Sequence, residues 1–150
     1  MKPWFERIKS GILAWRKHCK EVGENTAGFC QRGMRIACLM AHTPWPGAPE
    51  EKGVDTALDA HRDMVLHPER YPGWVEDHDI GTKPGAWACF LVPGGKTSTG
   101  EEAGHICLLI VSKLQRGDLQ KWVYDNNGVH AWTQKKYANR LHAAYTYRGA

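Results

Sequence analysis

Three apolar runs in the second half of the chain constrain its fold more than any other feature. "AWACFLV" covers residues 86–92, "HICLLIV" covers 105–111 and "KWVYD" covers 121–125. Runs of this length, separated by Gly-rich or charged turns, are typical of buried strands. "NNG" at 126–128 predicts a tight turn, and "AYTYR" near the end predicts a fourth strand. We therefore expect a small antiparallel sheet.

The first half of the chain has the periodicity of helices instead. Apolar residues recur at helical spacing over 3–20, again over 28–41 and again over 54–66. A Pro/Gly loop follows the second segment, and the stretch 67–85, which contains three prolines, is expected to be irregular. Helices first and strands after is an α+β order, so we expect N-terminal helices packed on the sheet.

The chain is long enough for one ordinary domain. It has 150 residues, of which 42% are hydrophobic, enough for a core of normal size. We divide it into a basic amphipathic helix, residues 1–22, and a domain over 23–150. "GILAW" is too short an apolar run for a signal peptide or a membrane span. We therefore expect synthesis in the cytoplasm.

Positive charge is concentrated at the N-terminus. The net charge is +4, while residues 1–20 contain six Lys or Arg against one Glu, a net of +5. The other 130 residues therefore carry +4 − 5 = −1. A basic helix on a neutral body can contact anionic polymers such as nucleic acid, a membrane or a cell wall. The alternative, which we favour from sequence, is a solvated helix face.

The five cysteines do not form the pattern of a disulfide framework or a zinc ribbon. Their number is odd and no CxxC pair occurs. Cys38, Cys89 and Cys107 lie in apolar runs and are expected to be small core residues. Cys30 differs because it opens the expected helix 28–41, where unpaired N–H groups and the helix dipole favour a thiolate. Cys30 is therefore a candidate nucleophile.

His105 precedes the apolar run 106–111 and follows a flexible polar loop. A strand would hold its imidazole beside a cleft, where a general base is useful, although a surface histidine can also simply end a strand. Asp125 ends the next expected strand, and a hairpin closing in register would bring its carboxylate beside His105. The carboxylate would then orient the imidazole so that its other nitrogen faces Cys30.

Taken together, these segments resemble a known family. A Cys at a helix start, followed by "PGAWACF", "GHICLLI" and "VYDNNG", is similar to the CHAP and NlpC/P60 branch of papain-like cysteine peptidases. The similarity is strongest to the peptidoglycan hydrolases of bacteriophage lysins, and the matching segments cover residues 25–128. The resemblance implies a papain-like fold and hydrolysis of an amide in the bacterial wall. The bond would be the muramoyl-L-alanine linkage or one within the stem peptide or cross-bridge.

The resemblance also implies a role for each residue of the constellation. Cys30 would be the nucleophile, His105 the general base and Asp125 the third member, with Asn127 as the nearest substitute. Many family members carry Gln or Tyr beside the nucleophile to help form the oxyanion hole, whereas this chain has Phe29. The backbone N–H of Cys30 and the side chain of Asn25 are the candidate donors.

We expect no cofactor and no metal. Some CHAP domains bind calcium in an Asp-rich loop before the cysteine, but "EVGENTAG" lacks that spacing. A zinc amidase would need two histidines and a third ligand in recognisable context. His61 is expected to be a half-buried core residue on the apolar stripe of the helix 54–66, and the other histidines lack ligand spacing. The stripe consists of Val54, Leu58, His61 and Val65.

The sequence leaves other functions open. An interbacterial toxin amidase of the same fold would have the same residues, and a non-catalytic module that binds the wall or nucleic acid would retain many of them. The segment "KKYANRLHAAYTYR" has the basic and aromatic composition of single-strand binders, but the neutral body argues against that function. We expect a monomer that acts on peptidoglycan after release. Anionic wall polymers are a second candidate partner, for the basic helix 1–22, beside the favoured interpretation of that helix as a solvated face.

Overall fold

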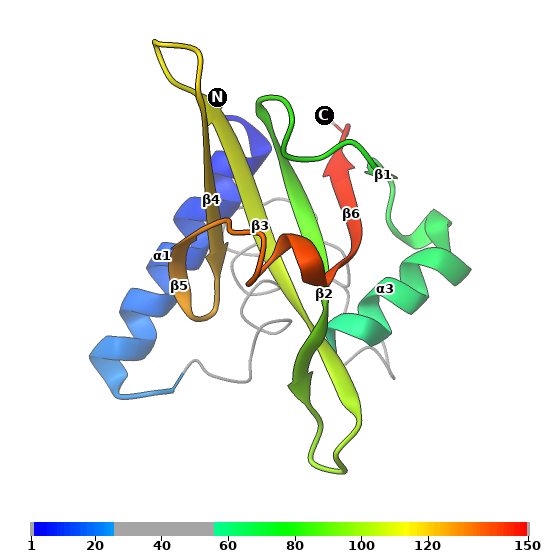
Figure 1. Cartoon of the computed structure of the whole chain (residues 1–150). Coiled ribbons are helices and arrows are strands. Elements are labelled where there is room, and N and C mark those ends of the chain that lie inside the picture. Colours follow the sequence, from blue (N-terminus) through cyan, green and yellow to red (C-terminus); the bar gives the residue numbers. More distant parts are fainter. Residues whose placement is uncertain (1, 26–55, 150) are drawn as a thin grey trace.

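The computed structural model describes residues 2–25 and 56–149. The helices are α1 (Trp4–Val22), α3 (Ala57–Leu66) and two 3-10 turns, Pro68–Arg70 and Ala138–Arg140. The strands are β1 (Trp74–Glu76), β2 (Gly85–Lys96), β3 (Glu102–Lys113), β4 (Leu119–Asp125), β5 (Gly128–Ala131) and β6 (Leu141–Tyr147). They form one antiparallel sheet in the order β1-β6-β2-β3-β4-β5 (Figure 1). The expected α+β order is confirmed.

The longer helices and strands were predicted from the sequence, whereas the short strands at the edges of the sheet were not. The helix expected over 3–20 is α1, and the four expected strands overlap β2, β3, β4 and β6, each of which begins before the expected segment. The turn expected at 126–128 connects β4 to β5. Two short edge strands were not predicted: β5, and β1, which lies within the stretch 67–85 expected to be irregular. The helix expected over 28–41 lies outside the described residues.

Both faces of the sheet are buried. Alternate residues of β3, Ile106, Leu108 and Ile110, pack with α1 and α3 on one face. The residues between them face the opposite side, together with Tyr137 and Trp132 from the connection between β5 and β6. Figure 1 shows α1 behind β4 and this connection, in orange, in front of the sheet. Burial on both faces explains why the strands read as continuous apolar runs.

Helix α3 presents a different stripe to the core from the one expected. The buried residues are Ala57, Ala60 and Met64, whereas Val65 is 59% exposed. The small Ala57 and Ala60 face the sheet, and Val65 lies on the outer side of the helix. The helix begins after Thr56, whose side chain accepts from the Asp59 N–H while Asp59 accepts from the Thr56 N–H. This capping box fixes the start of the helix.

Helix α1 is part of the core and not only a basic surface. Its residues Ile8 and Ile12 are buried among the sheet residues that also contact α3. Two of its cations contact the body: Lys9 lies 5.3 Å from the centre of the Tyr124 ring, and Arg16 Nε donates to the carbonyl of Asn126. Across 2–25 and 56–149, no helix is long and apolar enough to cross a membrane.

His61 is half-buried at the junction of α3 and the sheet, as expected. Its ring centre lies 5.2 Å from that of Phe90 and 5.0 Å from that of His142. Burial, reinforced by His142 and opposed by Glu76, lowers the pKa of His61 below its ordinary value of 6.5. The imidazole is therefore harder to protonate in the folded chain than in the unfolded one.

Protonation of His61 should make stability depend on pH. Because the folded pKa is the lower one, the unfolded chain binds more protons below pH 6.5, and stability falls as pH drops through that value. Urea midpoints at about pH 8 and about pH 5 should differ less in His61→Gln than in the wild type. His78→Gln is the control, since the His78 side chain is 87% exposed. An unchanged pH dependence in His61→Gln would contradict the assignment.

Candidate functional site

Strand alternation brings His105 and Asp125 to the same face of the sheet. Leu108 on β3 pairs with Tyr124 on β4, so continuing this register puts Asp125 opposite Cys107. Cys107 belongs to the core on the face away from the helices, and His105 is two residues before it on that same face. Diagonal neighbours of this kind are within reach of long side chains. The hairpin that joins β3 to β4, with the sequence "LQRGDLQ" at 114–120, therefore closes in the register that brings Asp125 beside His105.

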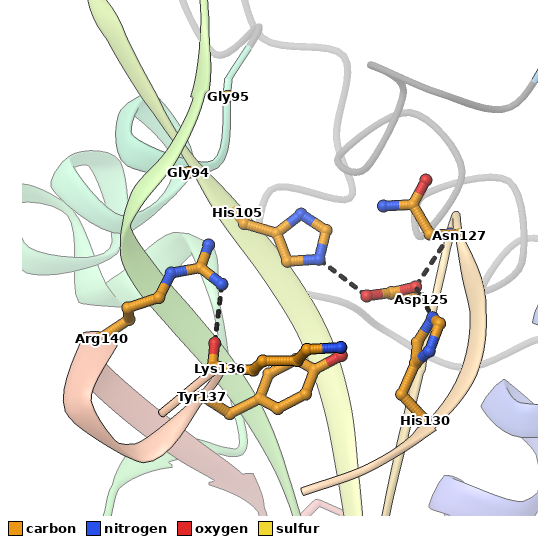
Figure 2. A pocket seen from close by; sticks show the side chains of 9 residues that line it. All are labelled: Gly94, Gly95, His105, Asp125, Asn127, His130, Lys136, Tyr137 and Arg140. Carbon is orange, nitrogen blue, oxygen red and sulfur yellow. Dashed lines mark hydrogen bonds and ion pairs between the residues drawn. The ribbon is translucent and has the colours of Figure 1, made fainter. Parts of the chain in front are cut away.

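The imidazole of His105 is held by a buried carboxylate. Its Nε2 lies 2.8 Å from Oδ2 of Asp125, whose side chain is only 3% exposed. The other oxygen, Oδ1, accepts from the backbone N–H groups of Asn127 and Gly128 at 2.8 and 3.1 Å. Three donors thus hold the carboxylate, which in turn orients the imidazole; Figure 2 shows the bonds from His105 and Asn127. Proton exchange with a neighbouring group is left to Nδ1.

The backbone just before His105 is held where β2 and β3 approach each other closely. A Cβ on Gly94 would lie 2.1 Å from the carbonyl carbon of Gly104, so only glycine fits there without movement. Glu102 Oε2 accepts from the N–H of Gly94 at 2.8 Å and from that of Gly104 at 2.9 Å. These two bonds, the first being the larger cause, lower the pKa of the Glu102 carboxyl. The clamp ties β2 to β3 immediately next to His105.

The connection between β5 and β6 supplies another wall of the pocket. Lys136, Tyr137 and Arg140 line it together with His105 and Asp125, around a volume of about 350 Å³ (Figure 2). The Tyr137 ring stacks on Trp132, with centres 5.4 Å apart, and belongs to the core below the pocket. Burial is the main cause that raises the pKa of Tyr137 to about 12. Its phenol therefore remains a hydrogen-bond donor at neutral pH.

His130 is a pocket residue that the sequence analysis missed. Its Nε2 lies 4.0 Å from Oδ1 of Asp125, although no carboxylate was expected near it. The hairpin after Asp125 explains the contact, because β5 runs back beside β4 and pairs His130 with Val123. Val123 faces the same side as Asp125. The "NNG" turn, continued as a strand, was therefore the signal that could have found His130.

The other candidates occupy different positions. Asn127 lines the pocket, but the group that bonds His105 is Asp125. Asn25 is exposed, three residues after the end of α1, and is not among the described residues that line the pocket. Cys30 lies outside the described residues. Cys89 and Cys107 are completely buried core residues, as expected, and Cys38 lies outside the described residues.

No metal cluster and no known relative identifies this site. Within the described ranges, no group of three His, Cys, Asp or Glu could hold a metal ion. No family model matches the chain, and no curated protein and no solved structure matches it either. The geometry and chemistry of the pocket therefore have to carry any functional argument.

A pair of neighbouring glycine substitutions should test the clamp. Gly94→Ala places a methyl group against the Gly104 backbone and should cost about 1–3 kcal/mol in the free energy of unfolding. Gly95→Ala is the matched control, because a Cβ there meets nothing within 4 Å, and it should change stability by less than about 0.5 kcal/mol. Urea unfolding measures both. Equal stability of the two variants would show that this approach of β2 to β3 is looser than described.

Proposed function

We propose that this protein is a peptidoglycan hydrolase that cleaves an amide bond by Cys-His-Asp nucleophilic catalysis. The bond would lie in the stem peptide or be the muramoyl-L-alanine linkage, as in the endolysin-type enzymes that the sequence resembles. The single observation that carries the proposal is the contact of His105 with the buried Asp125 at the edge of a pocket. An oriented imidazole is what a thiol needs from a general base.

The chemistry of a base fits His105 better than a purely structural role does. Its side chain is 13% exposed, so the ring is mostly shielded from water and yet borders the pocket. Asp125 occupies Nε2 and would stabilise the imidazolium that forms when Nδ1 takes up a proton. A histidine that only ended a strand would have no need of a carboxylate fixed by two further N–H groups.

The proposed reaction uses these groups in sequence. His105 Nδ1 takes the thiol proton of Cys30, and the thiolate sulfur forms a bond to the carbonyl carbon of the substrate amide. The tetrahedral oxyanion would be held by backbone N–H groups at the helix start expected at Cys30, with Asn25 as the candidate side-chain donor. The imidazolium then donates its proton to the leaving amine as the C–N bond breaks. His105 then deprotonates a water, whose oxygen bonds to the thioester carbon. The C–S bond breaks, the acid leaves, and the Cys30 thiolate recovers its proton from the imidazolium.

Turnover on purified sacculi tests the proposal directly. Cys30→Ala and His105→Ala should lower the release of new amine ends by about 10³-fold or more, because each removes a member of one catalytic unit. Thermal unfolding followed by circular dichroism should show both variants folded. His78→Ala is the control histidine and should retain wild-type activity. Wild-type rates in either variant would exclude the mechanism, and product masses would identify the bond.

Thiol reactivity tests the Cys30–His105 pair without any substrate. Iodoacetamide should alkylate Cys30 about tenfold faster in the wild type than in His105→Ala near pH 7, since a neighbouring imidazole raises the thiolate fraction. Mass spectrometry of the tryptic peptides separates the thiols, and Cys19, Cys89 and Cys107 serve as internal references because none is more than 2% exposed. Equal rates at Cys30 in the two proteins would contradict the pairing.

A further inference from the structure

We propose that Arg140 and Lys136 form a subsite for a carboxylate group of the substrate, next to the bond that His105 and Cys30 would cleave. The inference rests on the proposed hydrolase function, because the bound group is part of a substrate only if the protein cleaves a peptide amide. It adds the chemical class of the group that is recognised: a peptide amide with a free carboxylate close to it. Arg140 and Lys136 are then specificity residues, distinct from the catalytic ones.

Arg140 is fixed by neutral partners, and no carboxylate of residues 2–25 or 56–149 forms an ion pair with it. Its Nε donates to the carbonyl of Pro93 and its Nη1 to the carbonyl of Lys136, both at 2.7 Å. In the described ranges, no carboxylate lies within ion-pair distance of either Arg140 or Lys136. A guanidinium anchored through Nε and Nη1 still carries N–H groups on Nη2, in a fixed geometry suited to a planar anion. The anchoring makes the side chain preorganised for binding.

The charges that line the pocket correspond to a single negative ligand group. With neutral histidines, the described lining carries +1 on Lys136, +1 on Arg140 and −1 on Asp125, a net of +1. Asp125 is already used by His105 and by two backbone N–H groups. A monoanionic carboxylate balances the remainder, whereas a phosphate dianion would be only half compensated. The protonated phenol of Tyr137 is a further donor on this wall.

The segment that carries Lys136 and Arg140 contacts the structure next to His105 and also the core next to Asp125. Arg140 holds the Pro93 carbonyl, and the adjacent Gly94 is clamped by Glu102 beside His105. Tyr137, from the same connection, packs in the core below Asp125. Figure 2 shows Lys136, Tyr137 and Arg140 around the space beside the His105 ring. A carboxylate bound there would hold the neighbouring amide close to the imidazole, which is how remote binding orients a substrate.

Binding to the inactive protein tests the subsite independently of turnover. Two peptide probes would be titrated into Cys30→Ala protein and followed by the amide NMR shifts of Gly94 and Gly95. One is N-acetyl-Ala-Ala with a free C-terminus, and the other is N-acetyl-Ala-Glu-Ala-amide with only a side-chain carboxylate. Their carboxamide counterparts serve as neutral controls. We expect at least one acid to bind about tenfold or more tightly than its amide, and the acid that does so identifies the source of the carboxylate.

Substitutions in the same background assign the preference to residues. Arg140→Gln should abolish the acid-over-amide preference, Lys136→Gln should reduce it, and Lys135→Gln, an exposed neighbour that does not line the pocket, should leave it unchanged. Arg140→Lys, which retains the charge, should restore part of it. Thermal unfolding of each variant guards against misfolding, and Lys136→Gln leaves both tethers of Arg140 intact because they use backbone carbonyls. A preference that survives Arg140→Gln overturns the assignment.

Three further outcomes overturn the proposal as well. They are equal binding of acids and amides, no binding of any peptide, and displacement of the acid probe by inorganic phosphate more readily than by acetate. Sacculi whose carboxylates have been converted to methylamides distinguish failure of the subsite from failure of the hydrolase function. Wild-type protein equally active on native and methylamidated sacculi would refute the subsite and leave the hydrolase intact. Protein inactive on both would refute the hydrolase, while the peptide titration would still decide the subsite.

Discussion

The structure depends on the pairing of β2 with β3, two strands buried on both faces. Ala88, Cys89, Phe90 and their partners Leu108, Cys107 and Ile106 are completely excluded from water. Because successive side chains of a strand point to opposite faces, the register decides which side chains lie on each face of the sheet. A slip by one residue would turn Ile106 and Leu108 toward the pocket side and His105 toward the helices. The apolar contacts with α1 and α3 therefore also fix the orientation of a polar side chain on the other face.

The turn after β4 converts this pairing into a functional arrangement. The side chain of Asp125 is only 3% exposed, and burying a carboxylate in this way would be costly without donors. The turn N–H groups of Asn127 and Gly128 and the ring of His105 supply them. Arg16 of α1 adds a contact to the neighbouring Asn126 carbonyl, at 3.2 Å. Arg16, a basic residue of the N-terminal helix, thus helps to hold the turn that positions Asp125.

Sequence reasoning recovered the centre of the fold because apolar runs and helical periodicity report burial directly. It also anticipated the proximity of His105 to Asp125, since both lie at strand ends whose register a short hairpin determines. It missed β1, because a three-residue strand beside three prolines has no periodicity and takes its conformation from pairing with β6. The stripe on α3 was misplaced because two of its three buried residues are alanines, which are a weak apolar signal.

The cationic wall of the pocket was invisible in sequence for a different reason. "KKYANR" appeared only as a basic segment, and nothing local distinguishes Arg140 from the neighbouring cations. Its position results from two backbone carbonyls, one of them on Pro93, 47 residues away. That carbonyl adjoins Gly94, whose close approach to Gly104 is set by the absence of a side chain. The wall that carries Arg140 and the strand that carries His105 therefore share one junction, and a substitution there should disturb both.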